Sequence, residues 1–444
     1  MKRNAMKQLE EWKSGYNRKP LIVRGARQVG KTWLIKEFAK TAYENHVYVN
    51  FETDVLLKSL FIADFDIRRI LTSLELYAGI KIEPDKTLLI FDEIQEAEKA
   101  LTSLKYFYEN APQYHIIAAG SLLGIALQKN TSFPVGKVAF LDLYPLIFTE
   151  FLQAAGENGL ADVILNGQWD MMNVFKNKYI ERLKHYYYTG GMPEVVAGFM
   201  RNNDFREVRL IQQQILDAYE QDFSKHAPAS IVPRIRMLWN SIPAQLAKEN
   251  RKFIYGLIKQ GARAKEFELA LAWLTDCGLV HKVNRVTKPG FPLKAYEDFS
   301  AFKLFSVDVG LLACMSRLDT MSLLEGNIFF EEFKGALTEQ YVLQQLMTEK
   351  ACSVYYWSAE KSDSEIDFLL QSENRIIPLE VKAAENLHAK SLRFFVQKYN
   401  PEIAVRASLS DFREEEWLVN LPLYAVNGLI SYAYKKPNKP TATH

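Results

Sequence analysis

The chain has 444 residues, a formal net charge of +2 and 48% hydrophobic residues, which is the composition of a soluble globular protein with two to four domains. No apolar run reaches the roughly 18 residues of a transmembrane helix, and the N-terminus lacks the apolar segment of a signal peptide. Cys277, Cys314 and Cys352 are widely spaced, which argues against a disulfide framework or a zinc site. We therefore expect a cytoplasmic protein without a membrane segment.

The first predicted elements surround a phosphate-binding pattern. Residues 1–18 are expected to be helical, residues 21–23 to form a buried strand, and residues 33–40 to form a helix. The loop between strand and helix matches G-x-x-x-x-G-K-[ST], a pattern that directs backbone N–H groups and a helix N-terminus at a phosphate. Its residues are Gly25, Ala26, Arg27, Gln28, Val29, Gly30, Lys31 and Thr32. We expect this loop to bind ATP, with Lys31 on the β- and γ-phosphates and Thr32 as a ligand of Mg2+.

Two carboxylates end a later apolar run. After a strand at residues 46–51, residues 87–91 predict a buried strand that ends in Asp92 and Glu93. Asp92 is expected to help hold Mg2+, and Glu93 to act as the general base for the water that attacks the γ-phosphate. An Asp-Glu pair at a strand end is common when it stands alone, but its place some sixty residues after the loop favours the catalytic interpretation.

The remaining strands complete a parallel, doubly wound sheet. Residues 115–121 form a predicted strand that ends in Ser121, a candidate catalytic residue that senses the γ-phosphate or orients the water. Gly-Ser is also ordinary turn chemistry, so a turn is the alternative for Ser121. A last strand is expected at residues 138–143. The strand–helix alternation thus predicts an α/β P-loop domain over residues 1–150.

The middle of the chain has a different character. Residues 151–230 predict amphipathic helices that form a lid or connector, and its three consecutive tyrosines at 186–188 are interpreted as packing residues. Residues 231–324 predict a winged-helix-like domain, with helices at 232–250, 252–259 and 262–276. A hairpin is expected to follow, with strands at 279–283 and 293–296.

The same stretch is strongly basic. Residues 231–294 contain twelve Lys or Arg and four Asp or Glu, a net charge of +8, so the rest of the chain sums to −6. This asymmetry favours a polyanionic partner, plausibly DNA. Arg263 and Lys265 begin the third predicted helix, where a recognition helix contacts the groove. A winged helix that binds a protein partner and exposes a solvated basic face is an equal alternative.

A separate set of charged residues lies in the C-terminal region, a predicted domain over residues 325–435. Glu339 is expected on a helix, Asp367 on a strand, and Glu380 and Lys382 on the same face of a second strand. The three carboxylates are candidates to bind Mg2+ together, with Lys382 stabilising charge at a scissile phosphate. An inert domain that keeps these residues as buried ion pairs is the alternative. Residues 436–444 are interpreted as a flexible basic tail.

Several motifs together resemble bacterial and archaeal AAA+-type ATPases of unknown physiological role. These proteins pair the ATPase with a C-terminal domain of unknown function that is similar to the PD-(D/E)xK nuclease fold. The resemblance implies an ASCE-type P-loop core, a winged-helix middle and a restriction-endonuclease-like C-terminal α/β domain. The segments that carry it are Gly25–Thr32, Phe91–Gln95, Ala119–Leu123, Leu143–Leu146, Phe148–Phe151, Gly190–Glu194 and Lys303–Leu312.

The chain departs from this family at one position. Many relatives carry Gly-Arg where this chain has Gly136-Lys137. An arginine there supplies a planar, bidentate cation that lysine lacks. Arg24, Arg27 and Arg182 remain alternatives for a charge-stabilising finger. A finger from a neighbouring subunit would imply an oligomer, which nothing in the sequence requires.

Three functions are therefore open. The first is a Mg2+-dependent ATPase, the second a slow nucleotide-dependent switch that binds DNA or a protein, and the third a nuclease in which ATP gates Asp367, Glu380 and Lys382.

Overall fold

The computed structural model describes residues 1–121, 133–248, 252–319, 331–360, 363–384 and 389–436. The chain divides into two compact units. The N-terminal unit contains Lys2–Tyr144 and, from much later in the chain, Ala272–Leu279; the C-terminal unit contains the rest. Among the described residues, no helix is both long and apolar enough to cross a membrane.

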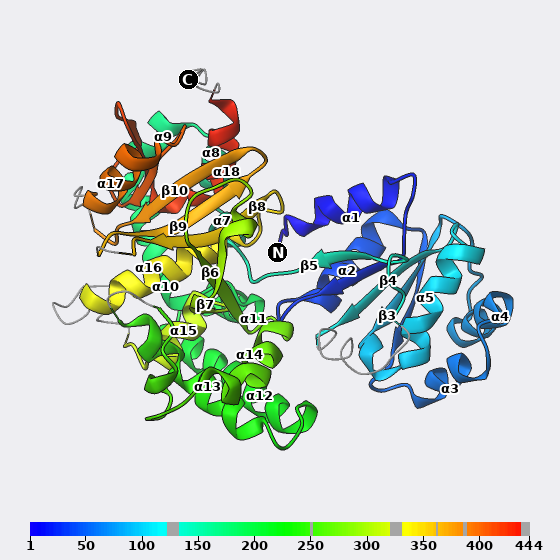
Figure 1. Ribbon diagram of the computed structural model, residues 1–444. Coiled ribbons are helices and arrows are strands. Elements are labelled where there is room, and N and C mark those ends of the chain that lie inside the picture. The colour runs from blue at the N-terminus through cyan, green and yellow to red at the C-terminus, as the bar shows by residue number, and fades with distance from the viewer. Residues whose placement is uncertain (122–132, 249–251, 320–330, 361–362, 385–388, 437–444) are drawn as a thin grey trace. The chain divides into compact units, whose positions relative to one another are not determined.

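The N-terminal unit is built on a five-stranded parallel sheet in the order β2-β3-β4-β1-β5 (Figure 1). Helices lie on both sides of it, as a doubly wound sheet requires. The strands are β1 Leu21–Arg24, β2 Asn45–Asn50, β3 Thr87–Asp92, β4 His115–Gly120 and β5 Ala139–Asp142. The helices are α1 Ala5–Ser14, α2 Lys31–Ala42, α3 Val55–Ala63, α4 Ile67–Ala78, η1 Ile94–Glu96 and α5 Glu98–Asn110.

The strand order brings the predicted motifs together. Every residue of β3 and β4 is buried, because both strands have neighbours on each side and helices above and below. β4 lies between β1, which leads into the loop at 25–32, and β3, which ends in Asp92. Because the carboxyl ends of parallel strands meet at one edge, the loop, Asp92 and Ser121 all lie at the same edge of this sheet. The predicted parallel α/β fold of this unit is therefore confirmed.

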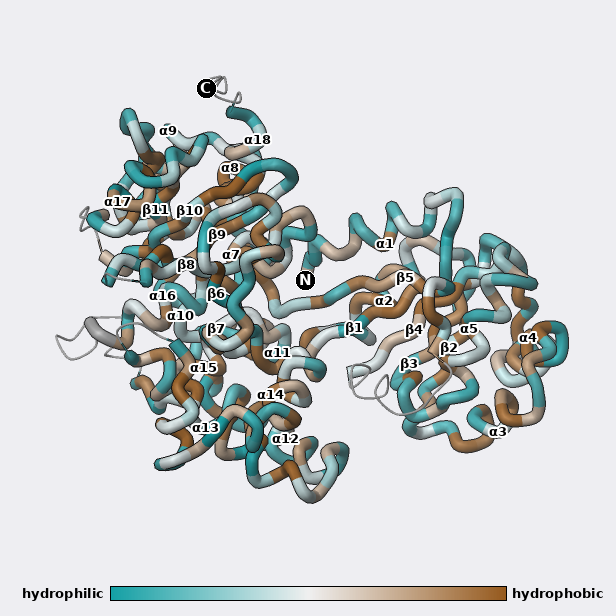
Figure 2. The backbone as a smooth tube through the Cα atoms, viewed as in Figure 1, coloured by the Kyte–Doolittle hydropathy of each residue, from teal (hydrophilic) through white to brown (hydrophobic). Residues whose placement is uncertain are grey.

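The C-terminal unit contains a helical layer and a mixed sheet. Its sheet has eight strands in the order β12-β13-β11-β10-β9-β8-β6-β7, and its hydrophobic stretches, such as those of β9 and β10, are brown in Figure 2. The strands are β6 Val280–Val286, β7 Glu297–Ser306, β8 Cys352–Ser358, β9 Glu365–Ser372, β10 Arg375–Val381, β11 Val405–Ser408, β12 Arg413–Glu414 and β13 Val419–Pro422.

The helices of this region fall into three groups along the chain. The first is α7 Phe148–Ala154, α8 Asn158–Leu165, α9 Trp169–Val174, α10 Lys176–Thr189, α11 Pro193–Asn202 and α12 Phe205–His226. The second is α13 Val232–Leu246, η2 Tyr255–Leu257, α14 Ala264–Asp276, η3 Leu293–Tyr296 and α15 Val309–Met315. The third is α16 Glu331–Leu346, α17 Lys390–Tyr399, η6 Leu423–Gly428 and α18 Leu429–Lys435.

Two predicted elements of the middle region were wrong. The helix expected at 252–259 is only the short 3-10 turn η2, because Gly256 interrupts it and glycine is a poor helix former. The strand expected at 293–296 is η3, and the strand begins at Glu297. The N–H of Leu293 donates to the side-chain Oε1 of Gln371 over 2.6 Å and not to a backbone carbonyl of a neighbouring strand. The predicted tail at 436–444 lies, from residue 437 on, outside the described residues.

The hairpin β6–β7 joins the same sheet as the strands of the region 325–435. β6 pairs with β7 antiparallel and with β8 parallel, through Arg285 with Tyr356 and Val286 with Trp357. This pairing satisfies backbone groups that the edge of an isolated hairpin would leave open. One sheet thus runs across the predicted boundary at residue 324.

A buried acid explains the Gly190-Gly191 motif of the C-terminal unit. Asp308 is fully buried and accepts hydrogen bonds from the N–H of Gly191 (2.6 Å), the N–H of Leu311 (3.0 Å) and Nε2 of Gln344 (2.9 Å). A side chain at residue 190 would collide with the Asp308 carboxylate. Tyr186, Tyr187 and Tyr188 are also buried, in agreement with their interpretation as packing residues.

Candidate functional site

The loop at residues 25–32 has the backbone of a phosphate cradle. Gly25 and Gly30 have φ angles of 149° and 92°, and Gln28 also has a positive φ, of 65°. A β-carbon at Gly25 would collide with the carbonyl oxygen of Leu143, so only glycine fits there. Gly30 precedes the first residue of α2 and provides no side-chain cap, so the first N–H groups of α2 stay available to an anion.

Lys31 lies inside this cradle. Its Nζ donates to the carbonyl oxygens of Gly25 (2.9 Å) and Ala26 (2.8 Å), and 7% of the residue is exposed. Burial lowers the pKa of Lys31 to about 8, although Glu93 and Asp92 oppose this shift. A cation that is poorly solvated and close to backbone N–H groups is suited to bind polyphosphate.

Asp92 is linked to the loop through a hydroxyl. Oγ1 of Thr32 and the hydroxyl of Tyr48 each donate to Oδ2 of Asp92 over 2.8 Å. Asp92 is buried. The partial burial of Tyr48, together with the negative charge of Asp92, raises the pKa of Tyr48 to about 12. The structure therefore brings together the two residues predicted to hold a metal ion. Tyr48 was not predicted as a residue of the site. The pairing of β2 with β3, which brings it close to Asp92, could have identified it.

Glu93 and Ser121 also meet. Nε2 of Gln95 donates to Oε2 of Glu93 over 2.6 Å, and Oγ of Ser121 approaches the same oxygen at 3.4 Å. Glu93 has a φ of 49°, a left-handed conformation that costs a non-glycine residue on the order of 1–3 kcal/mol and is concentrated at functional sites. Gln95 was not predicted, although it lies only two residues after Glu93.

Arg3 also contacts the phosphate loop, and no local sequence pattern indicates this contact. Its Nη1 donates to the carbonyl of Val29 over 3.0 Å and its Nη2 to the carbonyl of Tyr144 over 2.6 Å. The guanidinium is largely buried. Arg3 thus ties the loop to the segment that follows β5.

The candidate finger residues have partners of their own. Arg24 makes a bidentate pair with Asp142, Arg182 pairs with Glu157 at 2.9 Å, and Lys137 pairs with Glu109 at 2.9 Å. Arg27 is partly exposed, and its charge lowers the pKa of Lys31.

Comparison with known families identifies this unit. Residues 17–152 match the family described as AAA domain. This match agrees with the phosphate loop and the parallel sheet of the unit. Residues 180–322 match a domain of unknown function, DUF8612, and residues 334–425 match a second, DUF4143. A search of curated proteins gave no match.

The chain is also similar to solved structures of a Walker-type ATPase and of ORC proteins. The Walker-type ATPase PABY2304 of Pyrococcus abyssi matches with 15% identity and a TM-score of 0.45, over 70% of this chain and 94% of that one. The Aeropyrum pernix ORC1 protein in complex with DNA matches with 12% identity and a TM-score of 0.26, over 70% and 90%. Drosophila ORC bound to DNA matches with 14% identity and a TM-score of 0.23, over 73% and 94%.

In the C-terminal unit, three of the four predicted residues lie together. Nζ of Lys382 is 2.8 Å from Oε1 of Glu380, and the N–H of Val381 donates to Oδ2 of Asp367 over 2.7 Å. Burial raises the pKa of Glu380, Lys382 opposes this shift, and the nearby charge of Asp367 adds to it. Oε2 of Glu380 is buried without a hydrogen-bond partner among the described residues.

Glu339 has a different neighbour. Its Oε2 is 3.6 Å from Nζ of Lys303, a fully buried residue of β7 that also pairs with Glu365 at 2.5 Å. In the part of the chain that the structure describes, no three His, Cys, Asp or Glu residues form a group that could hold a metal ion. The structure therefore does not bring Glu339, Asp367 and Glu380 together as a metal site.

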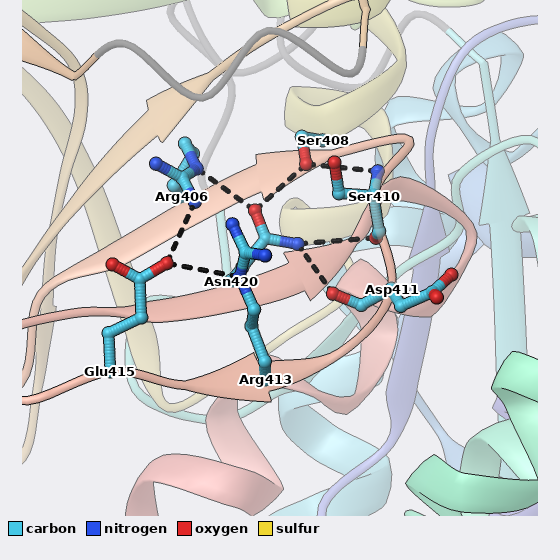
Figure 3. A network of polar contacts seen from close by, with 7 residues as sticks. All are labelled: Arg406, Ser408, Ser410, Asp411, Arg413, Glu415 and Asn420. Atoms are coloured by element: carbon cyan, nitrogen blue, oxygen red, sulfur yellow. Dashed lines mark hydrogen bonds and ion pairs between the residues drawn. The ribbon is translucent and has the colours of Figure 1, made fainter.

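A buried arginine borders Glu380, which the sequence analysis did not predict. Arg406 on β11 is paired in register with Glu380 on β10, and 2% of it is exposed. Figure 3 shows its network: Nε donates to Oδ1 of Asn420 over 2.9 Å, and Nη2 lies 3.4 Å from Oε1 of Glu415. Arg406 thus places a cation beside Glu380, and the strand register is the feature that could have identified it.

The predicted DNA-contact residues are exposed. Arg263 precedes α14 and Lys265 lies in its first turn. Glu266 and Glu268 are exposed in the same part of the helix, so the start of α14 has both signs of charge.

The low pKa of Lys31 predicts that nucleotide affinity depends on pH. Bound phosphates favour the charged lysine and raise its pKa, so binding takes up a proton when the pH is above about 8. We expect ADP affinity to stay level below pH 8 and to fall about tenfold by pH 9. Calorimetric titrations between pH 7.5 and 9.5 measure this. Lys31→Arg, which stays charged, should remove the slope, and a slope that persists in this variant contradicts the assignment.

Proposed function

We propose that this protein is a Mg2+-dependent ATP hydrolase of the AAA+ type. The observation that carries the proposal is the hydrogen bond from Thr32 to Asp92, beside a phosphate cradle that contains Lys31. A hydroxyl and a carboxylate at the end of a phosphate loop are the oxygen ligands that Mg2+ takes in P-loop ATPases.

Each residue has a role in this proposal. The N–H groups of the loop and the Lys31 ammonium bind the phosphates, while Thr32 and Asp92 hold Mg2+, which supplies charge neutralisation. Glu93 accepts the proton of the attacking water. Gln95 and Ser121 both donate to the Glu93 carboxylate and orient that base. Ser121, directly after β4, also senses the γ-phosphate.

Glu93→Gln tests the base. The variant keeps the size and one acceptor oxygen of the side chain but does not accept the proton. We expect ATP hydrolysis to fall by about a hundredfold or more, while the affinity for ATP stays close to that of the wild type. The matched control is Glu96→Gln, an exposed glutamate three residues later. Equal losses of binding and hydrolysis in Glu93→Gln would contradict the role of general base.

We further propose that the nucleotide state is coupled to a partner of the C-terminal half. In this organisation, residues 151–230 are a helical connector, residues 231–324 a winged-helix-like domain and residues 325–435 a PD-(D/E)xK-like domain. The net charge of +8 between residues 231 and 294 supports a polyanionic partner such as DNA, with a protein as the alternative. If ATP hydrolysis is slow, the protein acts as a switch whose binding to the partner depends on the bound nucleotide.

An ATP-gated nuclease is the second candidate. The contacts among Asp367, Glu380 and Lys382, and the bare buried oxygen of Glu380, support it. Two close carboxylates attract Mg2+, and an ammonium beside them stabilises charge on a phosphate. The ion pair of Lys303 with Glu339 favours the alternative, a domain that uses these charges structurally.

Glu380→Gln distinguishes these two outcomes. If the site cleaves nucleic acid, we expect wild-type protein with Mn2+ or Mg2+ and ATP to nick supercoiled DNA and Glu380→Gln to lose at least about 99% of that activity. The control is Glu373→Gln, an exposed glutamate in the turn before β10. If the wild-type protein leaves duplex DNA, single-stranded DNA and RNA intact, the nuclease proposal is wrong.

A further inference from the structure

A helix end from the middle of the chain lies on the phosphate loop. Residues Ala272–Leu279 follow the loop by about 245 positions, yet they belong to the N-terminal unit. They contain the last turn of α14 and Gly278, whose φ is 70°. A β-carbon on Gly278 would lie 3.3 Å from the backbone nitrogen of Ala26 and 3.7 Å from the carbonyl carbon of Gly25. The space between the turn and the loop is thus barely wide enough for one β-carbon.

This turn is a well-formed helix cap. The N–H of Leu279 donates to the carbonyl of Leu274 over 3.1 Å, and the N–H of Gly278 donates to that of Thr275 over 2.9 Å. These two bonds, with a left-handed glycine between them, form a Schellman motif, which ends a helix in one defined conformation. The turn therefore contacts the loop as a rigid element.

The contacted loop residues are the ones that hold Lys31. Gly25 and Ala26 provide the two carbonyl oxygens to which Nζ of Lys31 donates. When phosphate binds, Lys31 moves toward the anion, and its two hydrogen bonds to the carbonyl oxygens of Gly25 and Ala26 weaken or break. These peptide groups lie next to the Schellman motif that ends α14, and the first turn of α14 contains the exposed Lys265.

We propose that the Schellman motif at Gly278 regulates the phosphate loop, by coupling nucleotide binding in the AAA domain to helix α14. This inference rests on the proposed ATP-binding function. Linkage makes the coupling reciprocal: whatever displaces α14 changes nucleotide affinity by the same factor by which nucleotide changes that displacement.

Hydrogen exchange on the full-length wild-type protein tests the coupling without a mutation. ADP at saturation is expected to change the exchange of the amides of Cys277, Gly278 and Leu279 by about fivefold or more. The amides of residues 255–262, which lie before α14, serve as the internal reference and should stay unchanged. If ADP protects the loop at 25–32 and leaves 277–279 unchanged, the proposal is overturned while the ATP site stands. If ADP at millimolar concentration protects neither, the nucleotide-binding function itself has failed.

A pair of glycine variants gives the second test. Gly278→Ala and Gly261→Ala both put a β-carbon at a positive φ, but the one at Gly261 meets no atom within 4 Å. Both variants carry the same backbone strain, and only Gly278→Ala presses on the loop. We expect a loss of ADP affinity of about tenfold for Gly278→Ala and of less than about twofold for Gly261→Ala. Equal affinities in two folded variants would overturn the proposal, and the exchange experiment decides it if Gly278→Ala does not fold.

Discussion

Alanine at position 31 is expected to abolish ATP hydrolysis. Lys31 is the cation inside the phosphate cradle, where its Nζ donates to the carbonyls of Gly25 and Ala26. In a site that excludes water, the loss of this charge removes several kcal/mol of transition-state stabilisation, and each 1.4 kcal/mol is about tenfold in rate. We therefore expect Lys31→Ala to lower kcat/KM for ATP by at least about a thousandfold.

The matched control is Lys40→Ala, which removes the same charge from the exposed last turn of α2. Phosphate release by the wild type and both variants is measured with and without duplex DNA. Hydrolysis that needs Lys31 and rises with DNA supports coupling to the basic middle region. Hydrolysis that needs Lys31 but ignores DNA keeps the ATPase and favours a protein partner. A Lys31→Ala protein as active as the wild type rules the ATPase proposal out.

The sequence was most informative where function depends on contiguous residues. The loop at 25–32 and the Asp92-Glu93 pair are read directly, because strand, turn and helix follow one another in the order that the chemistry needs. The contact of Ser121 with Glu93 was not predicted, but it agrees with the rule that the ends of neighbouring parallel strands lie at one edge. Local pattern therefore predicted both the fold of this unit and the candidate residues at its edge.

Residues that reach the site from other elements carried no such signal. Tyr48 contacts Asp92 because β2 pairs with β3, and Arg3 reaches Val29 from the N-terminal segment. Gly278 contacts Ala26 across about 250 residues of sequence. Such contacts are set by packing of the whole unit, and a single sequence without its structure does not show which distant residue fills each position.

The C-terminal unit shows the same division. The spacing of Asp367, Glu380 and Lys382 on two neighbouring strands was enough to predict their proximity, because strand residues two apart share a face. Glu339 lies on a helix, whose position over the sheet depends on tertiary packing, and there it pairs with Lys303. The joining of β6 to β8 is likewise a tertiary pairing, which the turn residues around the hairpin do not encode.

Replacing Asp308 is expected to have the largest effect on stability. Asp308 is fully buried, and its two carboxylate oxygens accept hydrogen bonds from Gly191, Leu311 and Gln344. Asp308→Ala leaves these donors buried without an acceptor, at about 1–3 kcal/mol for each. We expect a total loss on the order of 4 kcal/mol or more. Burial raises the pKa of Asp308 while the N–H donors oppose that shift, and Asp308→Asn removes the charge together with one of the two acceptor oxygens.

Urea unfolding of the full-length protein, with hydrogen exchange of the amides in α15, measures the loss in the C-terminal unit. Asp66→Ala is the matched control, since Asp66 also accepts hydrogen bonds from two backbone N–H groups, those of Arg68 and Arg69, but at an exposed helix start. That variant should lose only about 1 kcal/mol, the usual value of a helix cap. Asp308→Asn should fall between the two, because one amide oxygen still accepts where two carboxylate oxygens did. If Asp308→Ala lowers the free energy of unfolding by no more than Asp66→Ala does, the hydrogen bonds of Asp308 to Gly191 and Leu311 do not stabilise the unit. The Gly190-Gly191 motif then needs another explanation.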